Sequence, residues 1–166
     1  LFYSTQAMPR AFIVHGAKTL QGRDAIFKEL SSSEFNPLTY VILEEPSRLT
    51  TNTSGENLQK EANPTILEYS PNSVTIKATL LEDGYLVLGD TFYPGWNAYV
   101  DGEKNRVLKT NYILRSVFLE KGAHLVQFIY EPKSFTIGMI ITLTSIVILI
   151  PVSIFCNRFV NRIRRR

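Results

Sequence analysis

The sequence has little cysteine and little histidine, which excludes several kinds of site. Its one cysteine, Cys156, rules out a disulfide within the chain. Cys156 is then either a small apolar filler or an acylation site near a membrane face. The two histidines, His15 and His124, lie far apart in sequence, so we expect each to be structural. The sequence also has no metal-spaced Cys/His cluster, no GxSxG and no glycine-rich phosphate loop, so we expect no metal and no cofactor.

Charge is missing from one long stretch. Residues 135–156 form a run of 22 residues without a charged side chain. At 1.5 Å per residue a helix of this length is about 33 Å long, against a hydrocarbon core of roughly 30 Å. The run therefore predicts one transmembrane helix over residues 133–157, in which Pro151 is tolerable.

Acidic residues are missing from the end of the chain. Residues 1–134 carry thirteen basic and all fifteen acidic side chains, whereas residues 135–166 carry five arginines and no acid. Basic residues directly after a membrane span indicate the cytoplasmic side. We therefore predict a basic cytoplasmic tail over residues 158–166 and an external domain over residues 1–132. The net charge of +3 arises from this basic tail beside the membrane span, so it does not indicate a nucleic-acid partner.

The external domain is predicted to be mainly β: an antiparallel, sandwich-like domain with one short helix. Short apolar or alternating runs separated by turn residues are typical of a sandwich or a partly open barrel. The helix is expected over residues 24–30, with Asp24 as its N-cap. The strands are expected at residues 11–14, 39–43, 66–70, 74–80, 85–89, 96–100, 106–108, 112–119 and 124–130.

The first residues and one internal stretch give weaker signals. Leu1 is not an initiator methionine and no signal peptide opens the chain, so we expect a piece of a longer or processed protein. Residues 47–62 are polar and are predicted to form a flexible loop. Asn52 begins an N-glycosylation sequon there, a three-residue match that is common by chance.

Residues 90–102 (DTFYPGWNAYVDG) are the centre of the predicted domain. Pro94 and Gly95 suit the two central positions of a type II turn. Asp101 and Gly102 between apolar runs indicate a type I′ hairpin turn. We expect Asp90 to accept hydrogen bonds from the loop amides of residues 91–93.

The same stretch holds the candidate binding residues. Tyr93, Trp96 and Tyr99 lie near a rigid turn, and their rings are suited to contact saccharides. The alternative is structural, with Trp96 plugging the end of the sandwich and Tyr93 packing beneath it. Asp90 and Asp101 form a possible carboxylate pair for glycosidic chemistry, but the turn roles already explain both residues, so we assign no catalytic residue.

Several of these motifs, in this order, resemble the C-terminal region of the YfhO family. They are MPRAF at 8–12, VILE at 41–44, DTFYPGW at 90–96, VDG at 100–102, GAHLV at 122–126, FIYEP at 128–132, and Ser134, Phe135 and Gly138 at the start of the membrane helix. The family consists of multi-spanning bacterial membrane proteins similar to GT-C glycosyltransferases. These use a bundle of membrane helices, an acidic residue in an early external loop, and a polyprenyl-phosphate sugar as donor.

The resemblance implies a role for the parent protein in decorating cell-envelope polymers, such as teichoic acids, with sugar. This chain would be its external accessory domain and last membrane helix. That helix would pack against a helix bundle that precedes Leu1, through the small residues Gly138, Thr142, Thr144 and Ser145. The implied partners are the membrane, the bundle, a polyprenyl-phosphate sugar and a wall polymer. The alternative is a single-span, membrane-tethered β module that binds wall glycan or an envelope protein and is not an enzyme.

Overall fold

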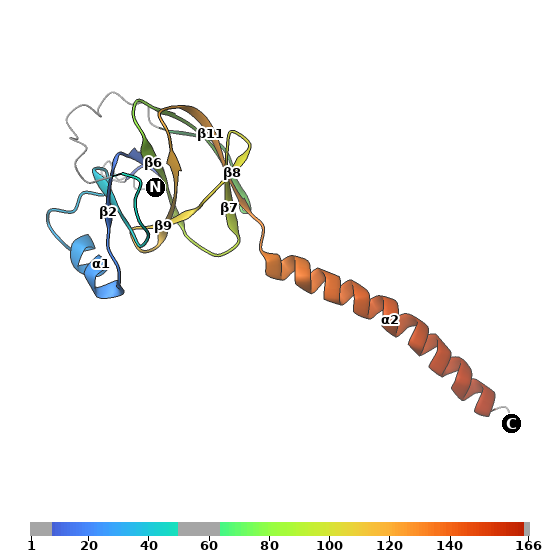
Figure 1. Ribbon diagram of the computed structural model, residues 1–166. Helices are drawn as coiled ribbons and strands as arrows, with labels where there is room; N and C mark the ends of the chain where they lie inside the picture. Colours follow the sequence, from blue (N-terminus) through green and yellow to red (C-terminus); the bar gives the residue numbers. More distant parts are fainter. Residues whose placement is uncertain (1–7, 50–63, 165–166) are drawn as a thin grey trace, which may run out of the picture. The chain divides into compact units, whose positions relative to one another are not determined.

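The computed structural model describes residues 8–49 and 64–164. The chain divides into two compact units, residues 1–131 and residues 132–166. The first unit is built mainly of strands in two sheets, as the sequence predicted (Figure 1). Residues 50–63, which hold most of the expected loop and the sequon at Asn52, lie outside the described residues.

Sheet A has six strands in the order β1-β6-β10-β9-β3-β2. Its central strand β6 is buried on both faces over its first five residues, which explains why this run is apolar without alternation. The bounds are β1 Ala11–Val14, β2 Gly16–Thr19, β3 Tyr40–Leu43, β6 Gly84–Thr91, β9 Leu108–Thr110 and β10 Leu114–Leu119.

Sheet B has five antiparallel strands in the order β4-β5-β11-β7-β8. Its long strands alternate, as expected for a sheet with one buried face: in β5, Ile76 and Ala78 are fully buried and Lys77 is exposed. The bounds are β4 Thr65–Ser70, β5 Ser73–Leu80, β7 Trp96–Val100, β8 Glu103–Asn105 and β11 Gly122–Tyr130.

The main core joins the two sheets. Residues such as Leu88 and Val117 of sheet A pack with Ile76 and Phe128 of sheet B, and all four are fully buried. A second cluster, around Tyr85, lies on the other face of sheet A. It is covered in part by residues 47–49, where the Tyr85 hydroxyl contacts Ser47 Oγ at 2.9 Å and accepts a hydrogen bond from the Arg48 amide at 3.1 Å. Sheet A is therefore an inner layer of the unit.

One edge of sheet A departs from the antiparallel prediction. Strand β2, which the sequence did not predict, pairs in parallel with β3 through the crossover helix α1 (Arg23–Leu30). Gly22, with φ of 86°, is the N-cap and no side chain caps the helix, so the expectation that Asp24 would be the N-cap is wrong. Gly22 can adopt this conformation because it has no Cβ.

A partly buried contact joins helix α1 to both parallel strands. Glu29 accepts hydrogen bonds from Lys18 of β2 at 2.8 Å and from the Tyr40 hydroxyl of β3 at 2.6 Å. Burial, followed by the neighbouring Glu29 carboxylate, raises the pKa of Tyr40 to about 12. Lys18 and Tyr40 together lower the pKa of Glu29. These contacts position a short helix that has one fully buried side chain, Ile26.

The loops of the central stretch have the backbone that their turn residues suit. Gly95 has φ of 109° and the Trp96 amide bonds to the Tyr93 carbonyl at 3.4 Å, as a type II turn requires. Asp101 and Gly102 have φ of 53° and 86°, the signs that a type I′ turn needs.

A further turn was not predicted. The expected strand at residues 112–119 starts only at Leu114, because Asn111 and Tyr112 both have positive φ. Asn111 is buried, and its amide and its side-chain Oδ1 bond to the carbonyl and the amide of Ile42 at 2.9 and 2.8 Å. Asparagine adopts this left-handed conformation more readily than most residues. Through its two bonds to Ile42, Asn111 also links the turn to strand β3 of sheet A. The single predicted strand at residues 106–108 is replaced by the two short strands β8 and β9.

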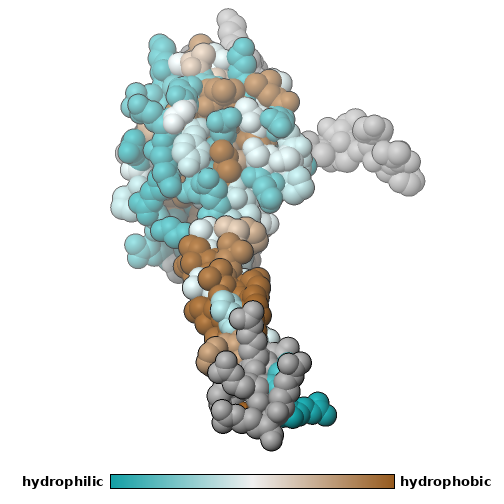
Figure 2. Space-filling model, turned by 90° about the vertical axis from the view of Figure 1, so that its right-hand side faces the viewer, coloured by the Kyte–Doolittle hydropathy of each residue, from teal (hydrophilic) through white to brown (hydrophobic). Residues whose placement is uncertain are grey.

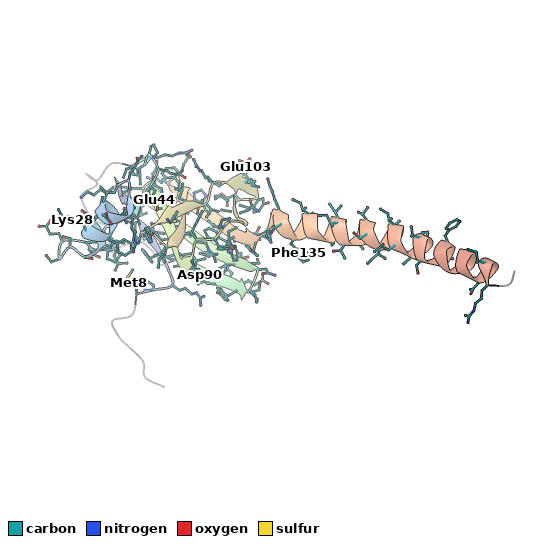
Figure 3. The ribbon with its side chains drawn as sticks, turned by 90° about the horizontal axis from the view of Figure 1, so that it is seen from below. Met8, Lys28, Glu44, Asp90, Glu103 and Phe135 are labelled. Carbon is teal, nitrogen blue, oxygen red and sulfur yellow. The ribbon has the colours of Figure 1, made fainter. Side chains whose placement is uncertain are left out.

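The second unit is helix α2, which spans Lys133–Ile163 and contains Pro151. Its residues Lys133–Phe155 form a stretch long and apolar enough to cross a membrane. The described side chains of this stretch are exposed (Figure 3) and mostly hydrophobic, in contrast to the mainly hydrophilic face of the first unit that Figure 2 shows. The helix continues past the predicted end of the span at 157 and includes residues 158–163 of the expected tail.

Candidate functional site

One end of the sandwich is hollowed where β6 and β11 end and β7 and β10 begin. The hollow has a volume of about 400 Å³ and is open to solvent. We call it the aromatic depression because four of its eight lining residues are aromatic. The lining residues are Tyr69, Pro71, Asp90, Thr91, Tyr93, Trp96, Arg115 and Tyr130.

Beneath the aromatic depression lies an array of three charged side chains. Asp90 accepts from Arg115 Nη2 at 2.8 Å through Oδ2, and from Arg10 Nη2 at 2.9 Å through Oδ1. The side chain of Arg115 is only 3% exposed and that of Arg10 is 51% exposed. Burial lowers the pKa of Arg115, opposed by the Asp90 charge, whereas the bond to Asp90 raises the pKa of Arg10. Asp90 therefore compensates one buried and one exposed cation.

Trp96 forms the floor of the aromatic depression. The Arg115 guanidinium lies 3.7 Å from the centre of the Trp96 ring and 5.5 Å from that of Phe128. On β11, the Tyr130 ring is 5.3 Å from Trp96, which is also packed against the main core. One face of Trp96 is therefore occupied by a cation–π contact and is not available to a ligand.

The three aromatic residues proposed from the sequence do not lie together. Tyr93 and Trp96 both line the aromatic depression, and Tyr93 is 61% exposed. Tyr99 alternates with the buried Ala98 and lies on the outer face of sheet B, where its hydroxyl donates to Glu131 at 3.3 Å. Burial and Glu131 raise the pKa of Tyr99. The strand period of two separates Tyr99 from the other two residues.

Four further residues of this region were not singled out from the sequence: Arg10, Tyr69, Arg115 and Tyr130. For Arg115 a signal was present. Arg115 lies on the same face of its strand as the buried Val117 and Leu119, because side chains two residues apart point to the same side. A strand that turns this face to the core must therefore bury a cation. Asp90 likewise lies two residues beyond the buried Leu88 and so on the same face of β6. An inward arginine and an inward aspartate at neighbouring strand ends indicate an ion pair.

The structure assigns Asp90 and Asp101 to different surroundings. Among the described residues, the hydrogen-bond partners of Asp90 are the Arg10 and Arg115 guanidinium groups, so the expected role as acceptor for the amides of residues 91–93 is wrong. Asp101 lines a second hollow with other partners. The two carboxylates do not share a site.

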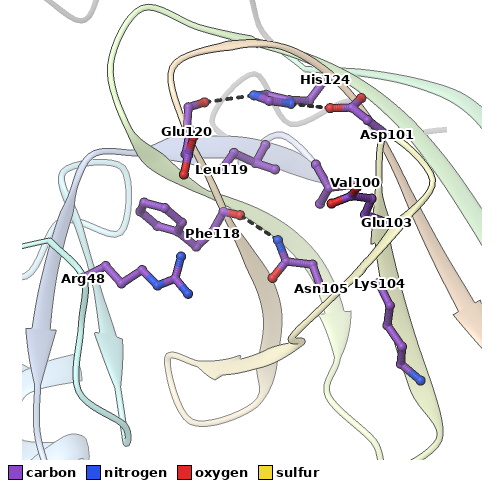
Figure 4. Close-up of a pocket in the computed structure, with 10 residues that line it drawn as sticks. All are labelled: Arg48, Val100, Asp101, Glu103, Lys104, Asn105, Phe118, Leu119, Glu120 and His124. Atoms are coloured by element: carbon purple, nitrogen blue, oxygen red, sulfur yellow. Dashed lines mark hydrogen bonds and ion pairs between the residues drawn. The ribbon is translucent and has the colours of Figure 1, made fainter.

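The second hollow, with a volume of about 430 Å³, is lined by residues of the β7–β8 hairpin and of the end of β10 (Figure 4). His124 is held there at both ring nitrogens, by Asp101 Oδ2 at 2.7 Å and by the Glu120 carbonyl at 3.0 Å. Asp101 Oδ1 also accepts from the Leu125 amide at 2.8 Å. Both ring nitrogens are thus engaged by groups of the fold, and neither is directed to a metal or a substrate. We interpret this hollow as structural.

Asp101 makes stability depend on pH. Its bonds to the Leu125 amide and to His124 lower its pKa below the ordinary value of 3.8. A lowered folded-state pKa stabilises the protein at pH values above 3.8, and that stabilisation is lost as the pH falls through the folded-state pKa. We expect Asp101→Asn to lower the free energy of unfolding by about 1 kcal/mol or less at pH 7, since the side chain is half exposed.

The measurement is urea denaturation at pH 7 and at pH 3. The difference between wild type and Asp101→Asn should shrink at pH 3. Glu103→Gln, an exposed change on the same hairpin, serves as the control. A difference that grows on acidification would contradict this role for Asp101.

The other residues considered for a chemical or binding role are His15, Cys156 and the small polar residues of α2. His15 is buried, with Nδ1 2.9 Å from the Asp83 carbonyl. Within residues 8–49 and 64–164, no group of three or more His, Cys, Asp or Glu side chains could hold a metal ion. The side chain of Cys156 lies outside the described part. In α2, the hydroxyls of Thr142, Thr144 and Ser145 donate to backbone carbonyls four residues earlier.

A β-sandwich followed by a helix long and apolar enough to cross a membrane indicates the class: a folded domain with one candidate membrane span. A family model described as "Bacterial membrane protein YfhO" matches residues 47–142, more than half of the chain. The chain belongs to this YfhO family, as the resemblance indicated.

One curated relative extends this comparison. A protein named "Uncharacterized protein YfhO" from Bacillus subtilis (strain 168) is 27% identical over 82 residues. The match covers 49% of this chain and 10% of that protein, so the matched segment is about a tenth of its relative's length. No solved structure matches the chain.

Proposed function

We propose that this chain is the external accessory domain and last membrane helix of a polytopic, glycosyltransferase-like protein of the bacterial envelope. The observation that carries the proposal is the extent of the family match, which begins before β4 and ends inside α2. The family match thus covers strands β4 to β11 of this domain together with the start of the apolar helix. The relative is about ten times longer than the matched segment, which leaves room for a helix bundle.

In this proposal the chemistry belongs to the parent protein. The bundle transfers sugar from a polyprenyl-phosphate donor to an envelope polymer such as teichoic acid. The sandwich lies on the external side and holds the acceptor polymer at its aromatic depression. The basic residues at the end of α2 and directly after it, such as Arg164, lie on the cytoplasmic side, following the positive-inside rule.

The experiment that tests this proposal has two arms. The reading frame upstream of Leu1 is expected to continue through about ten or more apolar segments, each of about 20 residues. The full protein in proteoliposomes is then expected to transfer radiolabelled sugar from polyprenyl phosphate to a wall polymer. A start codon and signal peptide directly upstream would overturn the proposal, as would an intact bundle without transfer.

The second candidate function is a single-span, membrane-tethered module that binds wall glycan without being an enzyme. It is favoured by one observation, that all eight lining residues of the aromatic depression belong to the first unit. The upstream reading frame separates the two candidates directly.

A further inference from the structure

We propose that the aromatic depression binds a saccharide that carries an acidic group, such as a phosphate. Tyr69 and Tyr93 would contact the sugar ring and Arg10 would meet the acidic group. The inference deepens the proposed function by naming the ligand class of the domain. The proposed function is needed only to say where the saccharide comes from; the binding itself is argued from the aromatic depression.

The ring contacts follow from exposure. Tyr93 is 61% exposed and Tyr69 is 51% exposed, and both line the aromatic depression. The Arg10 guanidinium lies 4.1 Å from the centre of the Tyr69 ring, so one face of that ring is covered and a ligand meets the other. Trp96 lies deeper, with one face against Arg115. Exposed rings with a polar edge suit a ligand that has apolar faces and a hydroxyl rim. The two tyrosines therefore supply the walls, and Trp96 supplies the floor.

The charge preference follows from the array of Asp90, Arg10 and Arg115. Two guanidinium groups face one carboxylate, so the array keeps one positive charge. Arg115 is buried, so the exposed charge of the array is on Arg10. Arg10 is not itself a lining residue, but it bonds to two that are, Asp90 and Tyr69, and so lies at the rim of the aromatic depression. Arg10 already bonds to Asp90 and to the Tyr69 hydroxyl, which fixes its position. An arginine that is held in place suits phosphate or carboxylate oxygens.

The burial of Arg115 and the low exposure of Asp90 indicate that the aromatic depression is a built site. The Asp90 side chain is 15% exposed, although it bears a full charge. The buried Nε of Arg115 has no hydrogen-bond partner among the described residues, which is unusual for a buried polar atom. The volume of about 400 Å³ falls within the range of roughly 300–1,000 Å³ of small-molecule sites.

The test uses the whole chain in detergent micelles and the fluorescence of Trp96, the sole tryptophan, which lies in the aromatic depression. Three probes are titrated: glucose 1-phosphate, glucose and inorganic phosphate. We expect glucose 1-phosphate to bind about tenfold more tightly than either other probe, because it alone offers both a ring and an anion.

Two variants and two matched controls assign the contacts. Tyr93→Ala should weaken glucose 1-phosphate about tenfold, as expected for loss of a ring contact. Arg10→Gln should reduce its affinity to that of glucose. Tyr99→Ala, on the other face of β7, and Arg106→Gln, in an exposed pair with Glu45, should leave binding unchanged. Thermal unfolding of each variant shows that the domain is folded.

Each other outcome overturns the inference. Equal binding of inorganic phosphate, unchanged in Tyr93→Ala, would show an anion site without sugar recognition. Equal binding of glucose would remove the role of Arg10. If no probe binds, the aromatic depression is structural, and the transfer assay on the full protein still tests the proposed function independently.

Discussion

Replacing Asp90 by asparagine is expected to lower the free energy of unfolding by about 3–5 kcal/mol, the range for removing one partner of a buried ion pair. The Arg115 side chain is 3% exposed, and Asp90 is the carboxylate that compensates its charge at 2.8 Å. Arg10 also binds Asp90, so the variant leaves two guanidinium groups close together without an anion. Asp90→Asn keeps the side-chain size, which assigns the loss to charge.

The measurement is urea denaturation of the whole chain in micelles, followed by Trp96 fluorescence. Glu45→Gln is the control: it removes the partner of Arg106 in a pair whose side chains are 41% and 73% exposed. Its effect should be below about 1 kcal/mol. A loss for Asp90→Asn as small as that of the control would show that Arg115 is not held by this pair.

A double variant separates the pair from its surroundings. Arg115→Met removes the buried cation, so Asp90→Asn added to it should do much less harm than Asp90→Asn alone. Residues in one ion-pair network give interaction energies of about 0.5–3 kcal/mol in such cycles. Additive effects would contradict a direct coupling between Asp90 and Arg115.

Replacing Trp96 by alanine is the second large effect. It is expected to lower the free energy of unfolding by about 3 kcal/mol, the lower end for loss of a large core aromatic, because Trp96 is half-buried. The change removes packing against Tyr130 and the cation–π contact with Arg115. It also opens the end of the main core to water.

This variant has no tryptophan, so the β-sheet circular dichroism signal is followed against urea. Trp96→Phe is the matched variant and should be less destabilising, because it keeps a ring between Arg115 and Tyr130. A Trp96→Ala chain that is as stable as wild type but binds no glucose 1-phosphate would show that Trp96 is a ligand platform and not the floor of the aromatic depression.

Local patterns predicted most of the elements. The uncharged run at residues 135–156 predicted the membrane span, since length and apolarity alone decide that property. Alternation and turn residues predicted the strands of sheet B, because Pro94, Gly95 and Gly102 mark loops by their own backbone preferences. Local signals failed at Asn111 and Tyr112, where positive φ is adopted without glycine.

The errors in sheet A have one physical origin. Strand β2 is four residues long, and its pairing partner β3 lies beyond helix α1. No local period reveals such a parallel pair, because its hydrogen bonds are made between segments distant in sequence. Helix α1 begins after Gly22, whose φ of 86° is accessible to glycine because it has no Cβ, and no side-chain cap marks this start.

The sequence by itself determined the class of protein: a mainly β domain, a membrane helix with a basic end, and motifs that carry membership of the YfhO family. It also placed Tyr93 and Trp96 near one turn. Only the tertiary structure decided which side chains meet there. Arg10, Tyr69, Asp90, Arg115 and Tyr130 come from five different strands or strand ends, so their contacts depend on how two sheets pack, whereas Tyr99 is removed from the group by the alternation of a single strand.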